Sequence, residues 1–172
     1  MIVPSIAVRA AHPADAAAIA AVIAAAFEQY RGRLDPESAA FRETGAAIAR
    51  EFADGSGAIL AADDGTTLAC VMTKQVGDDL YFGRLAVAPA ARGRGLARLL
   101  VDAVEADARS RGLAGVRLGV RIALVENQQL FAGMGYVEIA RAAHPGFDHP
   151  TYITMRKSLT DRVQHTDTLS PQ

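Results

Sequence analysis

A glycine-rich stretch with two arginines contains the residue types and spacing best suited to chemistry. It follows an apolar segment that ends Leu85, Ala86, Val87, and it consists of Arg92, Gly93, Arg94, Gly95, Leu96 and Ala97. The first amides of a helix have no intrahelical partner and carry the positive end of the helix dipole, and glycines let an anion approach them closely. The two arginines add positive charge. The stretch is therefore predicted to bind a phosphate group at the start of a helix.

Two other phosphate-binding motifs do not fit this stretch. The P-loop requires Gly-Lys-Ser/Thr after four spacer residues, and the dinucleotide fingerprint requires a third glycine where Arg98 stands. For an isolated match, a helix start that tolerates glycines at a turn is the alternative interpretation.

The bulk composition is that of a globular protein with one core. The chain has 172 residues, of which 51% are hydrophobic and 22% are charged, and its formal net charge is -1. This balance excludes the strongly basic surface of a nucleic-acid-binding protein. The N-terminus lacks the pattern of a signal peptide, and no apolar run reaches the roughly 18 residues that span a membrane. We therefore expect a cytoplasmic protein with neither nucleic-acid nor membrane partners.

Cysteine and histidine usage argues against disulfides and metal sites. The single cysteine, Cys70, lies in an apolar run and is predicted to be a buried structural thiol. Of the four histidines, His12 and His165 are remote in sequence, and His144 and His149 lack helical ligand spacing. No metal is expected.

Hydrophobic periodicity predicts one strand and two helices at the start of the chain. Residues 6–10 alternate as in a strand, and apolar residues between Pro13 and Tyr30 recur at spacings of three and four, as in a helix. Asp35 as N-cap and Pro36 as first helical residue predict a second helix that extends to Phe52.

A β pattern then leads into the glycine-rich stretch. Residues 58–87 are predicted to form three antiparallel strands, with turns at Asp64-Gly65 and at residues 77–79. A helix follows over residues 95–110, with one apolar face and a glycine after its end. The next strand, residues 116–121, must run parallel to the strand before the loop because a helix connects them.

The remaining elements complete an α/β (α+β) fold. A short helix is expected over residues 126–133 and strands over residues 136–140 and 151–156. The result is a mixed, mostly antiparallel sheet of about seven strands with about four helices, within one domain over residues 1–159. Residues 160–172 are polar and aperiodic, and we expect a disordered tail.

Four further features accompany the loop: the segment LAVAP before it, the amphipathic segment GLARLLVDAVEADARSRG after it, the strand VRLGV, and Gly135-Tyr136 at the start of a late strand. Together with Arg92, Gly95 and Ala97, which match the pattern Gln/Arg-x-x-Gly-x-Gly/Ala, they resemble the GCN5-related N-acetyltransferase (GNAT) superfamily. The resemblance covers roughly residues 6–159 and implies the GNAT fold, with splayed parallel strands at a CoA site.

The resemblance also implies site residues. In that family the loop amides, here residues 92–97, hold the CoA pyrophosphate. The backbone of the preceding strand, here Leu85, Ala86 and Val87, receives the pantetheine arm. The main-chain N–H groups of Leu85 and Val87 are the ones expected to polarise the thioester carbonyl as an oxyanion site.

The sequence departs from the family on the helix before Gly135. Family members carry an Asn and a later Tyr there, and the Tyr protonates the CoA thiolate. Aligned on Gly135, Phe131 stands in the Tyr position and Leu124 in the Asn position, with Asn127 three residues later. Phe131 has no transferable proton, so it is expected only to border the cofactor. Asn127 is a candidate cofactor contact, with a helix-start role as the alternative.

General acid and base candidates are therefore spread over several segments. Relatives use a Glu on the strand before the loop, but residues 80–85 contain no carboxylate. Base candidates are Glu43 and His144, together with Asp148 and His149 in the last loop. Tyr136 is the candidate acid, followed by Tyr152.

The resemblance implies acetyl transfer from acetyl-CoA, as co-substrate, directly to a primary amine. Arg31, Arg33 and Arg42 favour a small acceptor that carries a carboxylate or phosphate, while a protein N-terminus stays open. The alternative is a non-catalytic acyl-CoA-binding sensor or partner domain of the same fold, favoured by the missing Tyr and Glu. A homodimer is also left open.

Overall fold

A mixed sheet and four α-helices make up the part of the chain that the computed structural model describes, residues 5–160. The strands are β1 (Ala7–Ala10), β2 (Gly57–Asp63), β3 (Thr66–Val76), β4 (Asp79–Val87), β5 (Gly115–Arg121), β6 (Val137–Ala142) and β7 (Tyr152–Ser158). The α-helices are α1 (Ala16–Phe27), α2 (Gly45–Ala53), α3 (Leu96–Ser110) and α4 (Val125–Gly133). Single 3₁₀ turns cover Pro13–Asp15, Glu28–Tyr30, Ala39–Arg42 and Pro89–Ala91.

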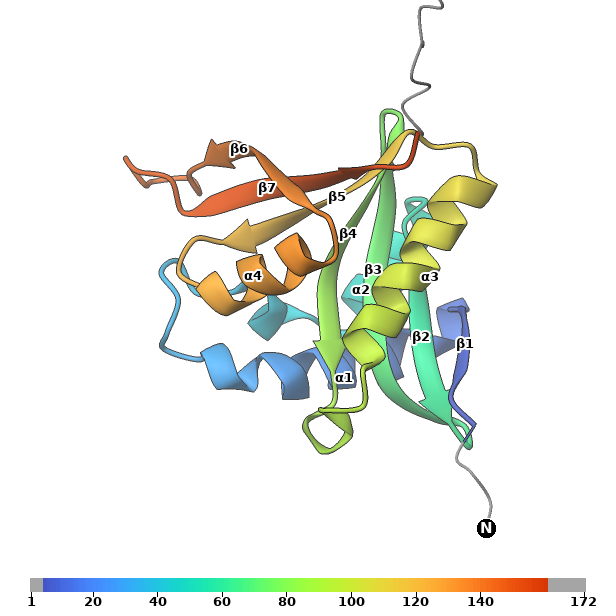
Figure 1. Ribbon diagram of the computed structural model, residues 1–172. Helices are drawn as coiled ribbons and strands as arrows, with labels where there is room; N and C mark the ends of the chain where they lie inside the picture. Colours follow the sequence, from blue (N-terminus) through green and yellow to red (C-terminus); the bar gives the residue numbers. More distant parts are fainter. Residues whose placement is uncertain (1–4, 161–172) are drawn as a thin grey trace, which may run out of the picture.

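The seven strands lie in the order β1-β2-β3-β4-β5-β7-β6. Every neighbouring pair is antiparallel except β4 with β5, which are parallel because α3 crosses between them (Figure 1). The predicted fold class is therefore confirmed. The prediction for the tail falls on residues of which all but Thr160 lie outside the described part.

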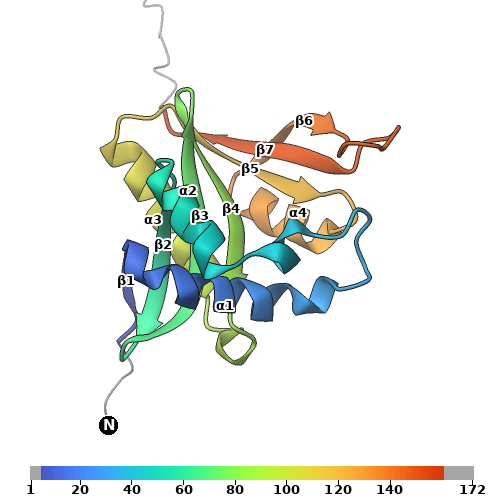
Figure 2. The ribbon, with the colours of Figure 1, turned by 180° about the vertical axis from the view of Figure 1, so that it is seen from behind.

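Helices cover both faces of the sheet. Helices α3 and α4 lie on one face, and α1 and α2 on the other (Figures 1 and 2). Leu100, Val101 and Val104 of α3 are fully buried on the first face, as are Ile19 and Ile23 of α1 on the second. Burial of such side chains stabilises the fold by roughly 1.5–3 kcal/mol each.

The single cysteine lies in the second of these cores, as predicted. Cys70 on β3 is fully buried, and its sulfur lies 4.0 Å from the carbonyl oxygen of Ile19. Burial raises the pKa of its thiol to about 12, so the thiol is neutral and unreactive at pH 7.

The predicted start of the second helix was wrong. Helix α2 begins at Gly45, and the hydroxyl oxygen of Thr44 caps it by accepting from the N–H of Ala47 at 3.1 Å. The helices cross closely there, because a Cβ at Gly45 would lie 3.2 Å from the Cα of Ala17. Asp35 and Pro36 lie instead in the loop that connects α1 to α2, and the close contact with α1 explains why a glycine suits position 45.

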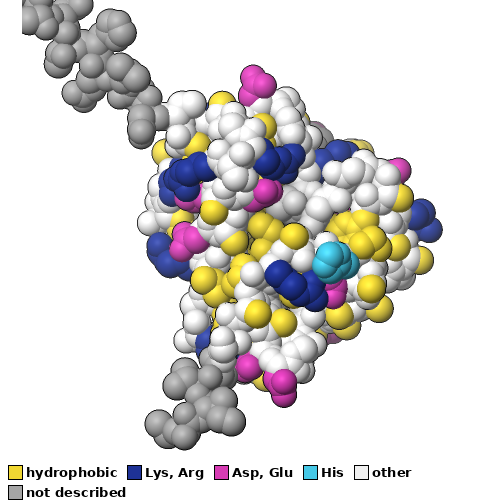
Figure 3. Space-filling view, turned by 90° about the vertical axis from the view of Figure 1, so that its right-hand side faces the viewer, with side chains coloured by type: hydrophobic (Ala, Val, Ile, Leu, Met, Phe, Trp, Pro, Cys, Tyr) yellow, Lys and Arg dark blue, Asp and Glu magenta, His cyan; other side chains and the backbone are white. Residues whose placement is uncertain are grey.

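The β2–β3 turn forms as predicted. Asp64 and Gly65 both have positive φ, 46° and 77°, the combination that a two-residue hairpin turn needs. On the side that carries α3 and β1, basic and acidic side chains lie interspersed with hydrophobic ones, in keeping with the near-zero net charge (Figure 3). Within residues 5–160, no helix combines the length and the apolar character that crossing a bilayer requires.

Candidate functional site

The two parallel strands separate halfway along their length. Pairing joins only residues 79–82 of β4 to residues 115–118 of β5, although β4 continues to Val87 and β5 to Arg121. In β4 an extra residue interrupts the pairing with β3, and Arg84 there has φ of 50°. A β-bulge bends the strand that contains it, so β4 turns away from β5 beyond this point (Figure 1).

The separation of β4 from β5 determines what the main-chain N–H groups of Leu85 and Val87 face. The N–H of Ala88 donates to the carbonyl oxygen of Leu68 on β3 at 2.8 Å. Because N–H groups alternate in direction along a strand, that of Val87 points away from β3, as does that of Leu85 two residues earlier. Both N–H groups therefore point toward the side of β4 on which β5 no longer pairs with it.

A hollow of about 180 Å³ lies between the separated strands, which we call the divergence hollow. Its apolar and backbone lining consists of Phe27, Phe82, Gly83, Leu85, Leu118, Gly119, Val120, Leu124 and Phe131. Its polar lining consists of Tyr30, Tyr81, Arg84, Arg121 and Asn127. Sequence reasoning had placed Leu85, Phe131 and Asn127 at this site, and the structure brings them together.

A larger hollow of about 550 Å³ adjoins the first, and we call it the β7 hollow. It is lined by Val76, Tyr81, Arg117, Gly119, Val120, Arg121, Ala143, His144, Pro145, Tyr152 and Thr154. The two hollows share residues of β4 and β5, namely Tyr81, Gly119, Val120 and Arg121. The two hollows therefore adjoin at these four residues, where the strands separate.

Tyr81 stands between two glycines at this junction. A Cβ at Gly83 would lie 3.3 Å from the ring of Tyr81, and a Cβ at Gly119 would lie 3.3 Å from its hydroxyl oxygen. The glycines thus make room for the tyrosine between the two strands. Burial raises the pKa of Tyr81, which keeps its hydroxyl group protonated.

The glycine-rich loop leads directly into α3. Gly93 and Gly95 have φ of 77° and 74°, and a Cβ at either position would meet no atom within 4 Å. Gly95 is the N-cap residue of α3 and has no side chain that could cap the first amides of the helix. Its carbonyl oxygen accepts a hydrogen bond from the N–H of Leu99. No side chain therefore crowds these two glycines at the start of α3, as close approach of an anion requires.

The loop arginines differ in their contacts. Arg92 donates from its guanidinium to the carbonyl oxygen of Ala26 at 3.2 Å, so it ties the loop to the C-terminal end of α1. Arg94 is more exposed and lies 3.8 Å from a carboxylate oxygen of Asp63. Leu96 is buried and anchors the first turn of α3, and Ala97 is half-buried beside it.

Tyr136, which was expected to be the general acid, lies in a position that does not suit this role. The side chain is 1% exposed and packs in the core against Phe82 and Phe131. Its hydroxyl group donates to Glu105 of α3 at 3.1 Å, and Tyr136 lines neither hollow. The reason is the glycine at 135, whose φ of 93° turns the chain sharply into the core before β6.

Glu43, a base candidate, is engaged by an arginine. The guanidinium of Arg84 donates to Glu43 at 2.5 Å and to both carboxylate oxygens of Glu51 at 2.6 Å. The hydrogen bonds to Glu51 raise the pKa of Arg84 and lower the pKa of Glu51. Glu43 is thus held by Arg84 and lines neither of the two hollows, which argues against Glu43 as the base.

His144, the other base candidate, lines the β7 hollow. Its Nδ1 lies 2.5 Å from the hydroxyl oxygen of Thr151, which also accepts the backbone N–H of His144 at 2.9 Å. Its ring packs edge-on to Tyr152, with centroids 5.0 Å apart. Burial, and secondarily the charge of Arg121, lower the pKa of His144, so the imidazole is neutral at pH 7.

Asp148 and His149 contact each other and not the hollows. The His149 Nδ1 lies 2.8 Å from the Asp148 carboxylate, and both side chains are exposed. Asn127 lies in the first turn of α4, and its amide nitrogen is 3.5 Å from the hydroxyl of Tyr30. Sequence reasoning missed Tyr30, Tyr81 and Arg121, because no local motif distinguishes them and only the packing of α1, β4 and β5 brings them together.

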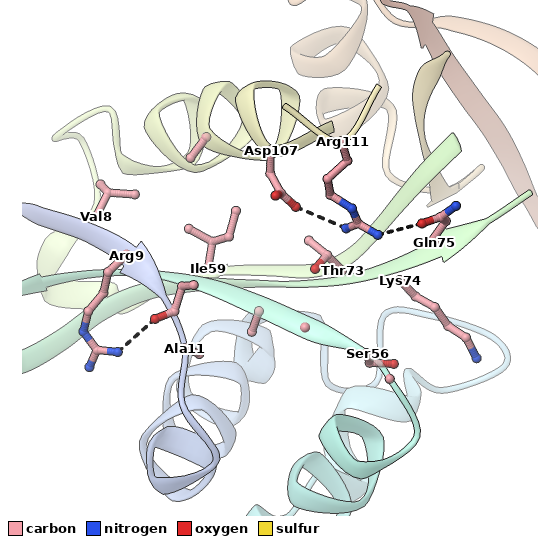
Figure 4. Close-up of a pocket in the computed structure, with 15 residues that line it drawn as sticks. Val8, Arg9, Ala11, Ser56, Ile59, Thr73, Lys74, Gln75, Asp107 and Arg111 are labelled. Carbon is pink, nitrogen blue, oxygen red and sulfur yellow. Dashed lines mark hydrogen bonds and ion pairs between the residues drawn. The ribbon is translucent and has the colours of Figure 1, made fainter. Parts of the chain in front are cut away.

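A further hollow of about 430 Å³ lies between β1, β2, β3 and α3 (Figure 4). Three of its four charged side chains are matched: Arg111 donates to Gln75 at 2.7 Å and to Asp107 at 3.3 Å, and Arg9 is bound to Asp15 at 2.8 Å. Within residues 5–160, no group of three or more His, Cys, Asp or Glu side chains is placed to hold a metal ion.

Comparison with known proteins places these features in context. The sequence model of the acetyltransferase (GNAT) family matches residues 19–136. A search of curated protein sequences finds no match.

Solved structures share the fold over nearly the whole chain. The ribosomal-protein-S18-alanine N-acetyltransferase from Escherichia coli is 20% identical, with a TM-score of 0.70 over 94% of this chain and 98% of that one. The PaiA N-acetyltransferase from Thermoplasma acidophilum, in complex with coenzyme A, is 16% identical, with a TM-score of 0.72 over 90% and 99%. A GCN5-related N-acetyltransferase from Rhodopseudomonas palustris is 27% identical, with a TM-score of 0.70 over 92% and 99%.

Proposed function

Because the chain belongs to the acetyltransferase (GNAT) family, we propose that it transfers the acetyl group of acetyl-CoA directly to the primary amine of a small metabolite. The observation that carries the proposal is the separation of β4 from β5 beside an uncapped helix start. Strand pairing ends at Phe82 and Leu118, and α3 begins at Gly95 just beyond the end of β4.

The loop and β4 supply the cofactor site in this proposal. The amides at the start of α3, from Gly93 to Ala97, hold the pyrophosphate of CoA, and the open space at both glycines fits such an approach. Arg94 adds charge, whereas Arg92 holds the loop in place against α1. The backbone of Leu85, Ala86 and Val87 receives the pantetheine arm.

The divergence hollow is the proposed place of the reacting thioester. The N–H of Leu85, which lines the hollow, is the proposed donor to the carbonyl oxygen as negative charge develops on it, and a fixed donor of this kind is typically worth about 10²–10³ in rate. The N–H of Val87 lies roughly 7 Å farther along β4 and is the proposed donor to the pantetheine arm. Phe82 and Phe131 exclude water from the apolar side of the hollow. Asn127 borders the same hollow and is proposed as a cofactor contact.

His144 is the proposed general base. It lines the hollow next to the thioester site, and it is neutral at pH 7, whereas Glu43 is bound to Arg84. For Nε2 to accept the proton of the acceptor ammonium, Nδ1 must carry a hydrogen and donate it to Thr151. The hydroxyl oxygen of Thr151 can accept from both His144 groups because it has two lone pairs.

No protein acid is needed in this mechanism. The CoA thiolate is a good leaving group, and it takes its proton from water. Phe131 in the position of the family tyrosine agrees with this, as does the core location of the Tyr136 hydroxyl.

Two measurements test the proposal. Acetyl-CoA at millimolar concentration should raise the melting temperature, because a ligand that binds only the folded state stabilises it. CoA release should then be measured with a panel of primary amines. Turnover supports the enzyme, whereas tight acetyl-CoA binding without turnover of any amine would support a non-catalytic sensor. Absence of any acetyl-CoA binding would refute both.

We also propose a homodimer. Its support is the edge strand β6, where Val137 is 62% and Ile139 is 49% exposed. Exposed apolar side chains on an unpaired strand edge favour association with another chain. Sedimentation equilibrium with the wild type and with Ile139→Lys tests it: a monomeric wild type would refute it.

A further inference from the structure

Within residues 5–160, Arg121 has no carboxylate at ion-pair distance, and the negative charge that acts on it is that of Asp35. Most arginines of residues 5–160 form ion pairs with Asp or Glu, namely Arg9, Arg31, Arg84, Arg94, Arg109, Arg111, Arg117, Arg141 and Arg156. Arg121 is half-buried, yet its observed partner is the neutral carbonyl oxygen of Pro36, at 2.5 Å from one guanidinium nitrogen. A guanidinium has five N–H donors, so others remain available.

Arg121 also stands where the two hollows meet. It lies at the end of β5 and lines both the divergence hollow and the β7 hollow. In the described chain, no Asp or Glu lines either hollow. The second arginine of the β7 hollow, Arg117, is bound at 2.5 Å to Asp79, a carboxylate that Arg156 shares, and Arg84 is bound to its two glutamates. Among the arginines of the described chain that line the two hollows, Arg121 is therefore the one without a direct ion pair.

The arginines expected from the sequence to bind an acceptor anion are placed differently. Arg31 is exposed, pairs with Glu28 at 2.7 Å and stacks over Phe41. Arg33 is exposed and donates to the carbonyl oxygen of Gln29 at 3.3 Å. Arg42 is exposed as well, and none of the three arginines lines either of the two hollows.

We infer that the acceptor is an amino carboxylate, and that Arg121 determines this specificity by binding the carboxylate of the substrate. The inference rests on the proposed function, because it names the substrate class of the same site. Arg121 forms a bidentate pair with the carboxylate, as a planar guanidinium favours. Because Arg121 borders the divergence hollow as well, the amine of the same molecule lies toward the thioester carbon while its carboxylate stays on Arg121.

The walls of the β7 hollow indicate an apolar body for this acceptor. Val76, Val120, Pro145 and the rings of Tyr81 and Tyr152 supply its surface, and its volume of about 550 Å³ is ample for one amino acid. Diamines and polyamines are disfavoured, because a second ammonium group would face Arg121 with no carboxylate to receive it.

Matched substrate pairs test the inference directly. L-phenylalanine and 2-phenylethylamine share the amine and the ring and differ in the carboxylate, as do L-leucine and 3-methylbutylamine. We expect kcat/KM at least 10-fold higher for the amino acid in each pair. We also expect Arg121→Gln to raise KM for the amino acids by 10-fold or more, with little change for the two amines, and Arg121→Lys to restore part of the loss.

Two controls separate this inference from the proposed function. Arg50→Gln removes an exposed arginine of α2 that lines neither hollow and should leave both kcat/KM values unchanged. The acetyl-CoA dissociation constant of Arg121→Gln should match the wild type, which also shows that the variant is folded. Equal or faster turnover of the plain amines, or no turnover of any amino acid by a protein that binds acetyl-CoA, would overturn the inference. Failure of the wild type to bind acetyl-CoA would instead refute the proposed function.

Discussion

The hydroxyl group of Tyr136 donates a hydrogen bond to Glu105 of α3 inside the core, at 3.1 Å. Lys157 of β7 binds the same carboxylate from the other side, at 3.0 and 3.1 Å. Burial, together with the negative charge of Glu105, raises the pKa of Tyr136 well above its ordinary value. This tyrosine therefore links the start of β6 to α3 and β7, and its hydroxyl group lies outside both hollows.

Tyr136→Phe should affect stability and not catalysis. Removal of the hydroxyl leaves Glu105 bound to Lys157, so we expect a loss of about 1 kcal/mol in the free energy of unfolding, measured by urea denaturation. The value of kcat and its dependence on pH should stay unchanged. A 100-fold loss of kcat without unfolding would restore Tyr136 as the general acid.

Substitutions at Phe131 test whether a protein acid is useful at all. Its ring packs edge-on to those of Phe82 and Tyr136, at 5.8 and 6.3 Å between centroids. Phe131→Tyr should give a modest gain in kcat or none, because a thiolate leaves readily without assistance. Phe131→Leu should lower stability by about 0.5–1.5 kcal/mol through lost ring contacts and leave the pH profile unchanged. A large loss of turnover in Phe131→Tyr would contradict this placement.

Valine at Gly95 should weaken acetyl-CoA binding specifically. Gly95 has φ of 74°, and Gly77 in the β3–β4 turn has φ of 59°, both with open space around the missing Cβ. Each valine variant should therefore lose stability by about 1–2 kcal/mol through backbone strain. Only Gly95→Val should raise the acetyl-CoA dissociation constant, by 10-fold or more, in calorimetric titration. Equal affinity of the two variants for acetyl-CoA would show that the pyrophosphate binds elsewhere.

The ion-pair cluster of Arg84 should be structural. Arg84→Ala leaves Glu43 with its side chain only 10% exposed and without its observed partner, so we expect a loss of about 1–3 kcal/mol, reduced from the fully buried case by the remaining solvent exposure. Arg31→Ala, which breaks an exposed pair with Glu28, should cost less than about 1 kcal/mol. Glu43→Gln should keep kcat within 10-fold of the wild type, and a greater loss would make Glu43 a base candidate again.

The activity should depend on pH through His144. Burial and Arg121 lower its pKa below the ordinary 6.5, so the neutral imidazole predominates above that pH and is lost only in more acidic solution. Other groups that line the same hollow are Arg117, Tyr81 and Tyr152. We expect kcat to be flat near pH 7 and to fall below pH 6.5. His144→Gln should lower kcat by about 10²–10⁴ and abolish this acidic limb.

Thr151→Val supplies a companion test of the same base. The hydroxyl of Thr151 contacts Nδ1 of His144, so its loss removes the group that favours the tautomer with a free Nε2. We expect a smaller loss of kcat than in His144→Gln, with the acidic limb retained. An unaltered pH profile in both variants would exclude His144 as the base.

The same lowered pKa has a consequence for stability. The unfolded chain binds a proton at His144 more readily than the folded one, so this histidine favours unfolding as the pH falls below about 6.5. The wild type should therefore lose stability between pH 7 and pH 5 relative to His144→Gln. The comparison uses urea denaturation at each pH.

The sequence by itself determined the local features of this protein. The glycines at 93 and 95 permit positive φ, the apolar stripe of residues 96–110 forms α3, and Asp64-Gly65 forms a hairpin turn, because each depends on residues within one turn or one hairpin. The family pattern of the loop is local as well. The fold class followed from the order of these elements, since connection rules leave few arrangements.

The tertiary structure alone decided which distant side chains meet. Asp35 and Thr44 both satisfy the local rule for a helix start, and the close contact of Gly45 with Ala17 selects the second. Arg84 reaches Glu43 and Glu51 across more than 30 residues of sequence, and Arg121 lines two hollows without a direct ion pair in the described chain. Such contacts depend on how whole helices and strands pack against one another. A local sequence pattern indicates only the backbone conformation of its own helix or strand and which face of that element is buried.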